Sequence, residues 1–373
     1  MTFLDQELAE QSAAAARLLE AVLPDLDRLG AAVRGPADRP VHGVVIAARG
    51  TSDNAARYAQ YLWGMRHGLP VALATPSLHS VYHRTLDLAG HGVVAVSQSG
   101  ASPDVVGVLA RARAAGRPTL AITNDADSDL ARAAAQVLAL NAGPERSVAA
   151  TKTYTTSLLA VALVSVALAG GDTADLDEVR RVPAALEAAV QATQGVDAAA
   201  RLLAPHHRAV CVGRGVNLAT AHEVALKLTE LTGTLVAPFS PADLLHGPIA
   251  AVGPDVPVLL VVPEEEATAS VLDLLPELRR RQAPVVLLGA PTRDGASATS
   301  SRPARPSVAV GETPESPAQA QAVVSLPGTA ALPGWLTPLT TVVTGQLLAR
   351  RVAELRGVDI DRPGDLSKVT RTD

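Results

Sequence analysis

A turn rich in hydroxyl groups is the first part of the sequence that could do chemistry. It contains Ser97, Gln98, Ser99 and Ser102, after an apolar run and before a stretch with helical spacing. A strand-to-helix turn presents free backbone N–H groups and the positive end of a helix dipole, and serines add O–H donors. One serine would be explained as a helix cap. Three serines and a glutamine in six positions exceed what a cap needs, so we favour a site for a phosphate monoester.

A second hydroxyl-bearing turn, formed by Gly50, Thr51 and Ser52, follows the first strand-like run. The carboxyl ends of neighbouring parallel strands meet at one edge of a sheet, where open α/β folds bind their ligands. We therefore expect the two turns to converge on one crevice. The chain has neither a Walker lysine nor a G-x-G-x-x-G sequence, which disfavours a nucleotide.

Acid and base groups come from a later helix, expected over residues 218–231. Glu223, Lys227 and Glu230 are four and three residues apart, so they share one helix face. A stripe of surface ion pairs is the alternative. The apolar side chains around these charges favour a functional set instead. His246, beside a Gly-Pro turn, could complete a general acid/base group near neutral pH, although a lone histidine is more often structural.

Lysine is scarce in this chain. Of the 32 Lys and Arg residues, only Lys152, Lys227 and Lys368 are lysines. Arginine keeps its proton at accessible pH, whereas the pKa of a lysine moves when the side chain is buried. The three lysines are either chance remnants of a biased composition or residues whose chemistry arginine cannot supply.

The elements that must position these residues alternate between strand and helix patterns. This alternation predicts two successive α/β domains, each with a mostly parallel sheet covered by helices on both faces, as in a flavodoxin-like three-layer sandwich. A polar bridge is expected around residues 170–178. Strands are expected at 41–48, 93–96, 119–123, 209–212, 256–262 and 285–288, and helices at 3–29 with a break at Pro24, 54–67, 104–115, 153–169 and 218–231.

The same pattern suggests five segments. They are an N-terminal helical arm (1–35), a first domain with the hydroxyl turns (36–180), a second domain with the acid and base residues (195–355), a flexible insert inside it (about 291–321) and a C-terminal tail (356–373). The insert is rich in Ser, Pro, Thr, Gly and Ala and has too little apolar surface to offset the cost of ordering.

Composition excludes several classes of protein. A hydrophobic content of 48% with 18% charged residues is typical of a globular chain, and a net charge of −5 argues against a nucleic-acid surface. Cys211, the single cysteine, excludes an intramolecular disulfide or a cysteine-based metal site, and it lies in an apolar run typical of a buried thiol.

Targeting signals are not expected either. The first residues lack a basic segment and an apolar core, and the longest apolar run, 158–170, is short of the roughly 20 residues that span a bilayer. We expect a cytoplasmic protein that contacts no membrane and needs neither a metal nor another cofactor.

Six motifs together resemble the sugar isomerase (SIS) family, in the double-domain layout of the isomerase half of glucosamine 6-phosphate synthase and its deaminase relatives. They are Ser-Gln-Ser-Gly (97–100), Ala-Ala-Thr-Lys (149–152), Gly-Arg-Gly (213–215), the helix segment 223–230, His-Gly-Pro (246–248) and the tail segment 361–368. One motif would be weak evidence, but six in order along nearly the whole chain are strong.

The resemblance implies a role for each candidate residue. Glu230 would move a proton between carbons 1 and 2 of the sugar, with Lys227 close by, His246 would open the ring, and Lys368 would close over the substrate. Family members are dimers, in which the histidine can come from the partner subunit. The residues implied to hold the sugar phosphate are Gly50, Thr51, Ser52, Ser97, Gln98, Ser99, Ser102 and the backbone near Val148.

Two departures from the synthase guide the expected activity. The chain shows no glutaminase segment with an N-terminal cysteine, and Arg49 stands where the synthase has a cysteine. Both make it look more like the stand-alone SIS-type glucosamine 6-phosphate deaminases, which release fructose 6-phosphate and ammonia. Two alternatives remain: a dehydratase or lyase acting on N-acetylglucosamine 6-phosphate through the same proton abstraction, and a non-catalytic phosphosugar sensor. The physiological direction and any allosteric effector stay open.

Overall fold

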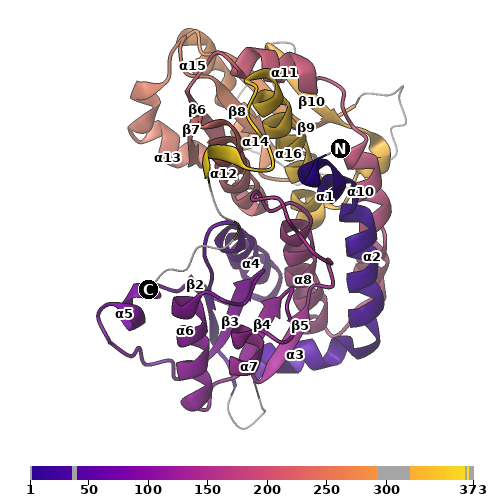
Figure 1. Ribbon diagram of the computed structural model, residues 1–373, viewed down its shortest axis with the longest axis vertical. Helices are drawn as coiled ribbons and strands as arrows, with labels where there is room; N and C mark the ends of the chain where they lie inside the picture. The colour runs from indigo at the N-terminus through magenta and orange to yellow at the C-terminus, as the bar shows by residue number, and fades with distance from the viewer. Residues whose placement is uncertain (1, 36–39, 293–319, 366–367, 369–373) are drawn as a thin grey trace, which may run out of the picture.

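Two five-stranded parallel sheets form the framework of the protein (Figure 1). The computed structural model describes residues 2–35, 40–292, 320–365 and 368. The first sheet has the order β2-β1-β3-β4-β5 and the second has the order β10-β9-β8-β6-β7. Counted along each domain, both are the order 2-1-3-4-5 of flavodoxin-like folds, so the predicted fold class is confirmed.

The strands of the first sheet are β1 (Gly43–Ala47), β2 (Val71–Leu73), β3 (His91–Ser97), β4 (Thr119–Thr123) and β5 (Gln136–Ala139). The strands of the second sheet are β6 (Arg208–Val212), β7 (Leu235–Phe239), β8 (Val258–Val261), β9 (Val285–Pro291) and β10 (Ala322–Leu326). The six strands predicted from sequence are the interior strands of the two sheets, and the edge strands β2, β5, β7 and β10 were missed.

Helices cover both faces of each sheet. The helices up to the end of the first sheet are α1 (Phe3–Ala9), α2 (Gln11–Val22), α3 (Leu26–Arg34), α4 (Thr51–His67), α5 (Ser77–Ser80), α6 (Pro103–Ala114) and α7 (Asp129–Ala133). The later ones are α8 (Lys152–Leu168), α9 (Thr173–Arg180), α10 (Val182–Val190), α11 (Val196–Leu203), α12 (Leu218–Thr232), α13 (Pro241–Leu245), α14 (Thr268–Leu272), α15 (Leu275–Arg280) and α16 (Thr337–Leu355). Short 3₁₀ turns occur at Leu23–Asp25, Gly215–Asn217, Pro248–Ala251, Gly328–Ala330, Gly334–Leu336 and Pro363–Asp365.

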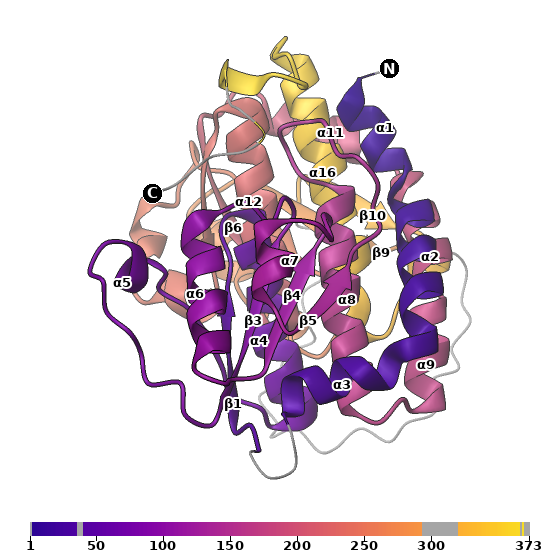
Figure 2. The same cartoon turned by 60° about the horizontal axis from the view of Figure 1, so that its bottom comes forward.

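Side chains alternate along the strands and so divide the first domain into layers. Val44 and Ile46 join the core formed with α4 and α8, whereas Val45 and Ala47 pack with α6 and α7 on the other face (Figure 2). This is the period of two expected of a strand buried on both sides. The second sheet is divided in the same way between α13–α15 and α11, α12 and α16.

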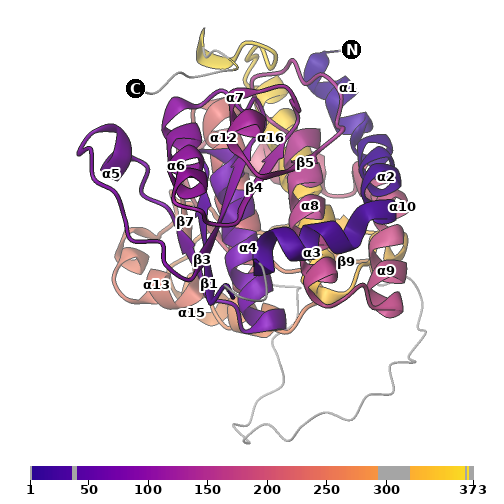
Figure 3. The ribbon, with the colours of Figure 1, turned by 90° about the horizontal axis from the view of Figure 1, so that it is seen from below.

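The N-terminal helices connect the two domains. α2 runs along the side of the molecule (Figure 1), and α3 lies across α8 (Figure 3). The predicted break at Pro24 is confirmed as a 3₁₀ turn between α2 and α3. Because α8 is apolar on every side, it is buried on every side along almost its full length.

The prediction of a polar bridge around 170–178 is wrong in detail, because most of this segment is helical. Asp172 caps α9, its carboxylate accepting the Ala174 N–H at 2.7 Å, and α9 continues to Arg180. α10 follows at once and packs against α2 and α16. Of the insert expected at 291–321, Pro291 ends β9, and residues 293–319 lie outside the described part of the chain.

No helix in the described ranges is both long enough and apolar enough to cross a bilayer. Cys211 is buried in β6 as expected, and burial raises the pKa of its thiol.

Candidate functional site

The first hydroxyl turn lies at the start of α4, which begins three residues earlier than predicted. Gly50 has φ +53°, a conformation that favours glycine, and it lets the chain turn from β1 directly into the helix. Thr51 and Ser52 therefore occupy the first helical turn. The Thr51 hydroxyl is already engaged: it donates to Glu223 Oε1 at 3.1 Å and accepts from Lys227 Nζ at 3.1 Å.

The second hydroxyl turn is held in shape by its own backbone. The Gly100 N–H donates to Ser97 Oγ at 3.2 Å, and the Ala101 N–H donates to Ser99 Oγ at 3.3 Å. Both hydroxyls thus act as acceptors within the turn and keep their O–H donors for a ligand. Ser102 is the N-cap of α6, yet its side chain makes no capping hydrogen bond. The turn can therefore offer hydroxyl donors beside a twelve-residue helix N-terminus.

Glycine is required at position 100. The residue has φ +60°, and a Cβ there would lie 2.1 Å from Ser128 Oγ. The backbone N–H of Leu130 also donates to the Gly100 carbonyl at 3.1 Å, which fixes the turn against α7.

An ion pair joins the two turns. Arg49 Nε and Nη2 lie 2.8 and 2.6 Å from Asp104 Oδ2. The Asp104 side chain is buried at the start of α6, and the Arg49 side chain is half exposed. In the sequence Arg49 was only a departure from the synthase pattern, whereas in the structure it links the end of β1 to the N-terminus of α6.

Helix α12 of the second domain brings its charged face to the start of α4. Glu223 accepts from Asn54 Nδ2 at 2.7 Å as well as from Thr51, and Lys227 Nζ lies 3.5 Å from Glu223 Oε1 and 2.5 Å from Glu230 Oε2. The exposed fractions of the Glu223 and Lys227 side chains are 0% and 1%, which excludes a solvated surface stripe. Glu230, 26% exposed, is the member of the set that a ligand could reach.

Burial and neighbouring charges act in opposite directions on this set. Burial raises the pKa of Glu223, and the nearby Lys227 ammonium only partly offsets it, so the net pKa is raised. Burial would lower the pKa of Lys227, but Glu223 and Glu230 outweigh it and hold the pKa above its ordinary value. Lys227 is therefore a fixed ammonium that orients the Glu230 carboxylate.

The tail places Lys368 on a residue that sequence reasoning missed. Lys368 Nζ lies 2.7 Å from Glu145 Oε2. The buried Glu145 carboxylate also accepts the N–H groups of Thr151 and Thr153 at 3.0 and 3.1 Å, and the Thr153 hydroxyl at 2.6 Å. Burial alone would raise the pKa of Glu145, but Lys368 and these donors bring it below its ordinary value.

Val148 lies in the loop between Glu145 and α8. Glu7 of α1 holds this loop by accepting the Ser147 N–H at 3.2 Å. Within the described residues the Val148 N–H makes no hydrogen bond, so it is available to a ligand.

Two predicted candidates lie away from the acid and base helix. His246 is exposed directly after α13, and no hydrogen bond between described residues joins its ring to Glu230 or Lys227. Lys152 is buried and pairs with Glu10 between α1 and α2. Of the three lysines, Lys152 thus has a structural partner rather than one at the hydroxyl turns.

The described residues contain no cluster of three or more His, Cys, Asp or Glu side chains suited to a metal ion. The chemistry available at the two turns is therefore anion binding by hydroxyl and backbone donors, next to a carboxylate oriented by a buried ammonium.

Comparison with known proteins identifies this arrangement. The SIS domain pattern matches residues 39–167 and 202–327. The chain is 30% identical over 378 residues to the glutamine–fructose-6-phosphate aminotransferase (isomerizing) of Xylella fastidiosa strain Temecula1. The alignment covers 98% of this chain and 58% of that protein. The chain thus spans a little over half the length of that curated relative.

Two solved structures share the fold over nearly their full lengths. One, from Silicibacter pomeroyi DSS-3, is named among the phosphosugar isomerases; it is 30% identical, with a TM-score of 0.78, and covers 97% of this chain and 100% of its own. The glucosamine-6-phosphate deaminase of Thermotoga maritima is 19% identical, with a TM-score of 0.72 over all of both chains, and shows the fold alone. The SIS pattern matches both halves of the chain, and the two sheets have the same strand order. The chain therefore belongs to the SIS domain family.

Proposed function

We propose that the protein is an amino-sugar-phosphate enzyme, a glucosamine 6-phosphate deaminase of the isomerising type. The observation that supports the proposal is the contact between α12 and α4. There the buried Lys227 ammonium bonds to the Thr51 hydroxyl of the first hydroxyl turn and to the reachable carboxylate of Glu230.

In this proposal the phosphate anchors the distal end of the substrate. Ser97, Ser99 and Ser102 donate O–H groups, Gln98 donates its side-chain amide, and the N-terminus of α6 adds its dipole. Binding energy from the phosphate then holds the reacting carbons against Glu230, which converts affinity into orientation.

Glu230 is the proposed proton carrier. After the ring opens, its carboxylate removes the proton from carbon 2 and delivers it to carbon 1. The carbon 1 oxygen gains the proton that the amine nitrogen loses, so that the aldose amine becomes a ketimine. Water adds to the ketimine carbon, the C–N bond breaks, and fructose 6-phosphate and ammonia leave. Lys227 keeps the carboxylate in place 2.5 Å away and stays protonated throughout.

Lys368 and Glu145 support closure of the site by the tail. In the structure the Lys368 ammonium is held by Glu145 at the start of α8, in the same loop as Val148. We propose that the tail covers the substrate from this position and keeps water away until the ketimine has formed.

The proposed role of His246 lies across a dimer interface. Its ring is exposed directly after α13 and makes no hydrogen bond to Glu230 or Lys227 within the described residues. We propose a homodimer in which this corner packs on the partner and His246 opens the sugar ring in the partner's site.

A non-catalytic sensor fits the site less well. Burying Glu223 and Lys227 costs desolvation free energy that mere recognition of a phosphate would not need. The hydroxyl turns alone would serve a sensor.

Product analysis on two substrates tests the proposal. The protein would be incubated separately with glucosamine 6-phosphate and N-acetylglucosamine 6-phosphate, with ammonia, fructose 6-phosphate and unsaturated sugars assayed. Ammonia and fructose 6-phosphate in equal amounts from the first substrate alone are expected. An unsaturated product from the N-acetyl sugar would favour the dehydratase instead, and no product from either would overturn the enzyme proposal.

A further inference from the structure

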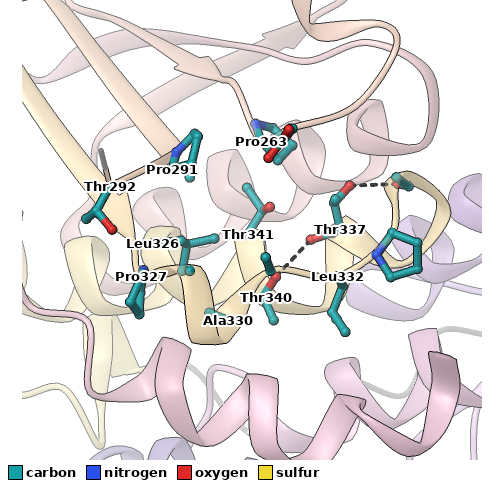
Figure 4. Close-up of a pocket in the computed structure, with 16 residues that line it drawn as sticks. Pro263, Pro291, Thr292, Leu326, Pro327, Ala330, Leu332, Thr337, Thr340 and Thr341 are labelled. Atoms are coloured by element: carbon teal, nitrogen blue, oxygen red, sulfur yellow. Dashed lines mark hydrogen bonds between the residues drawn. The ribbon is translucent and has the colours of Figure 1, made fainter. Parts of the chain in front are cut away.

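The second sheet has a cavity of its own at its carboxyl edge (Figure 4). Its volume is about 430 Å³, and its walls come from the ends of β8, β9 and β10 and the first turns of α16. Small-molecule sites occupy roughly 300–1,000 Å³ and lie preferentially at this edge of α/β sheets. None of its lining residues takes part in the reaction proposed above.

A bulge in β9 creates part of this space. Val324 of β10 pairs with Leu288, but the next residue, Ser325, pairs with Ala290, so Gly289 is left without a partner in the ladder. Gly289 has φ +79°, and a Cβ there would lie 2.6 Å from Thr341 Cγ2 of α16. The bulged glycine therefore keeps open the wall that Thr341 forms. Bulges of this kind are enriched beside functional sites.

Thr341 differs from the other threonines of its helix. The hydroxyls of Thr337, Thr340 and Thr344 each donate to the carbonyl three residues earlier, at 2.8, 3.4 and 2.7 Å. The Thr341 side chain is completely buried, and its Oγ1 has no hydrogen-bond partner among the described residues. Figure 4 shows it rising from α16 toward the space between Pro263 and Pro291.

Thr292 contributes a second hydroxyl of the same kind from the end of β9. Its Oγ1 is also buried and without a partner in the described ranges. A buried hydroxyl without a hydrogen bond destabilises the fold, so two of them on one cavity indicate groups that a ligand completes.

The charge of the cavity limits what it can bind. Among the described residues that line it, Glu264, exposed after the end of β8, is the only charged one. The described cation Arg181 is already bonded to the carbonyl of the lining residue Ala331 at 3.0 Å, so the carboxylate in the wall disfavours a phosphate. The remaining walls combine proline and leucine side chains, among them Pro291, Leu326 and Pro327, with threonine hydroxyls.

We propose that this cavity is a second ligand site, which binds an uncharged, unphosphorylated sugar. The sugar lays its apolar face on the proline and leucine side chains and hydrogen-bonds through its hydroxyls to Thr341 and Thr292. The two domains would thus bind two chemically different ligands at equivalent edges of their sheets, a phosphosugar on the first and a neutral sugar on the second.

Ligand-observed NMR and calorimetry with glucose and N-acetylglucosamine test the proposal. The first-domain site is saturated with glucosamine 6-phosphate, in the Glu230→Gln variant if the substrate turns over, so that only a second site responds. At least one of the two neutral sugars should bind with millimolar affinity, and Thr341→Val should weaken that binding about tenfold or more, because it removes a donor while keeping the volume.

Thr344→Val is the matched control. It makes the same change one turn along α16, at a hydroxyl that already has a partner, so the affinity should stay within about twofold. Thr292→Val is a second variant, on a half-buried residue, in case Thr341→Val does not fold. The proposal is overturned if neither sugar binds, if the first-domain ligand displaces both, or if neither valine variant of a cavity hydroxyl changes the affinity.

Discussion

The carboxyl edges of the two sheets share one topology and carry opposite chemistry. After the third strand of the first domain, β3, come Ser97, Gln98 and Ser99; after the third strand of the second, β8, come Pro263 and then Glu264 with two further glutamates. The first edge offers hydroxyl donors to an anion, and the second repels one. The fold supplies the same crevice twice, and a few turn residues decide what each crevice accepts.

The second domain supplies residues to the carboxyl edge of the first sheet, and they come from a helix, α12, instead of a turn. α4 and α12 each follow the first strand of their domain, and they contact one another. Glu223 of α12 is satisfied by Thr51 and Asn54 of α4. The proposed active site is therefore the place where the two related domains meet.

The largest expected effect is on kcat, and it compares Glu230 with Glu265, a carboxylate at the edge of the second sheet. Glu230→Gln should lower kcat for glucosamine 6-phosphate about a thousandfold with little change in Kd, because the amide cannot accept the carbon 2 proton. Glu265→Gln, a half-buried carboxylate at the second edge, should leave kcat within about twofold. Stopped assays of fructose 6-phosphate measure both. If the two variants behave alike, the proton carrier is misassigned.

The two buried lysines give the next comparison. Lys227→Met leaves Glu223 buried without its counter-charge and should lower the free energy of unfolding by about 3 kcal/mol. Lys152→Met should cost less, because the side chain of its partner Glu10 is 50% exposed and water can solvate it. Urea titrations followed by circular dichroism measure both losses. A larger loss for Lys152 would contradict this account of α12.

A smaller effect is expected at the hydroxyl turn. Ser99→Ala removes one O–H donor and should raise KM for the phosphosugar about tenfold while kcat changes little. Ser270→Ala, in the second domain, is the control and should not change KM. Initial rates over a range of substrate concentrations decide the point. An unchanged KM for Ser99→Ala would mean that the phosphate binds elsewhere.

The smallest effect concerns pH. The pKa of Glu145 is lowered in the folded protein, so the stability that its ionisation contributes is present above the ordinary value of 4.5 and is lost as pH falls below it. The Glu145→Gln variant has no carboxylate at this position, so it does not lose this contribution when pH falls. The difference in Tm between the wild type and the variant should therefore shrink from neutral to acid pH. Thermal melts across that range measure it, and a constant difference would contradict the sign.

Sequence patterns predicted the interior strands and missed the edges for one physical reason. Interior strands such as β3 and β8 are buried on both faces and read as apolar runs rich in valine, whereas an edge position allows β2 to be only three residues long and β7 to contain Pro238. The acid and base face of α12 was predictable because helix geometry fixes it within one element. Its partners Thr51 and Asn54 were not, because they lie about 170 residues away along the chain.

Glu145 could not be predicted for a different reason. In the sequence it is a single acid between Pro144 and Arg146, with nothing to distinguish it from a solvated loop residue. Only the folded chain brings Thr151, Thr153 and Lys368 to its carboxylate. Arg49 is similar, since its link to Asp104 depends on the pairing of β1 with β3.

The scarcity of lysine gives the protein an unusual reactivity toward amine-directed reagents. The side chains of Lys152 and Lys227 are 2% and 1% exposed, whereas that of Lys368 is 21% exposed. An acylating or aldehyde probe would therefore find Lys368 as the single accessible ε-amine among the described residues. Acylation there would neutralise the ammonium that pairs with Glu145, so modifying this one amine should by itself break the contact between the tail and the loop before α8.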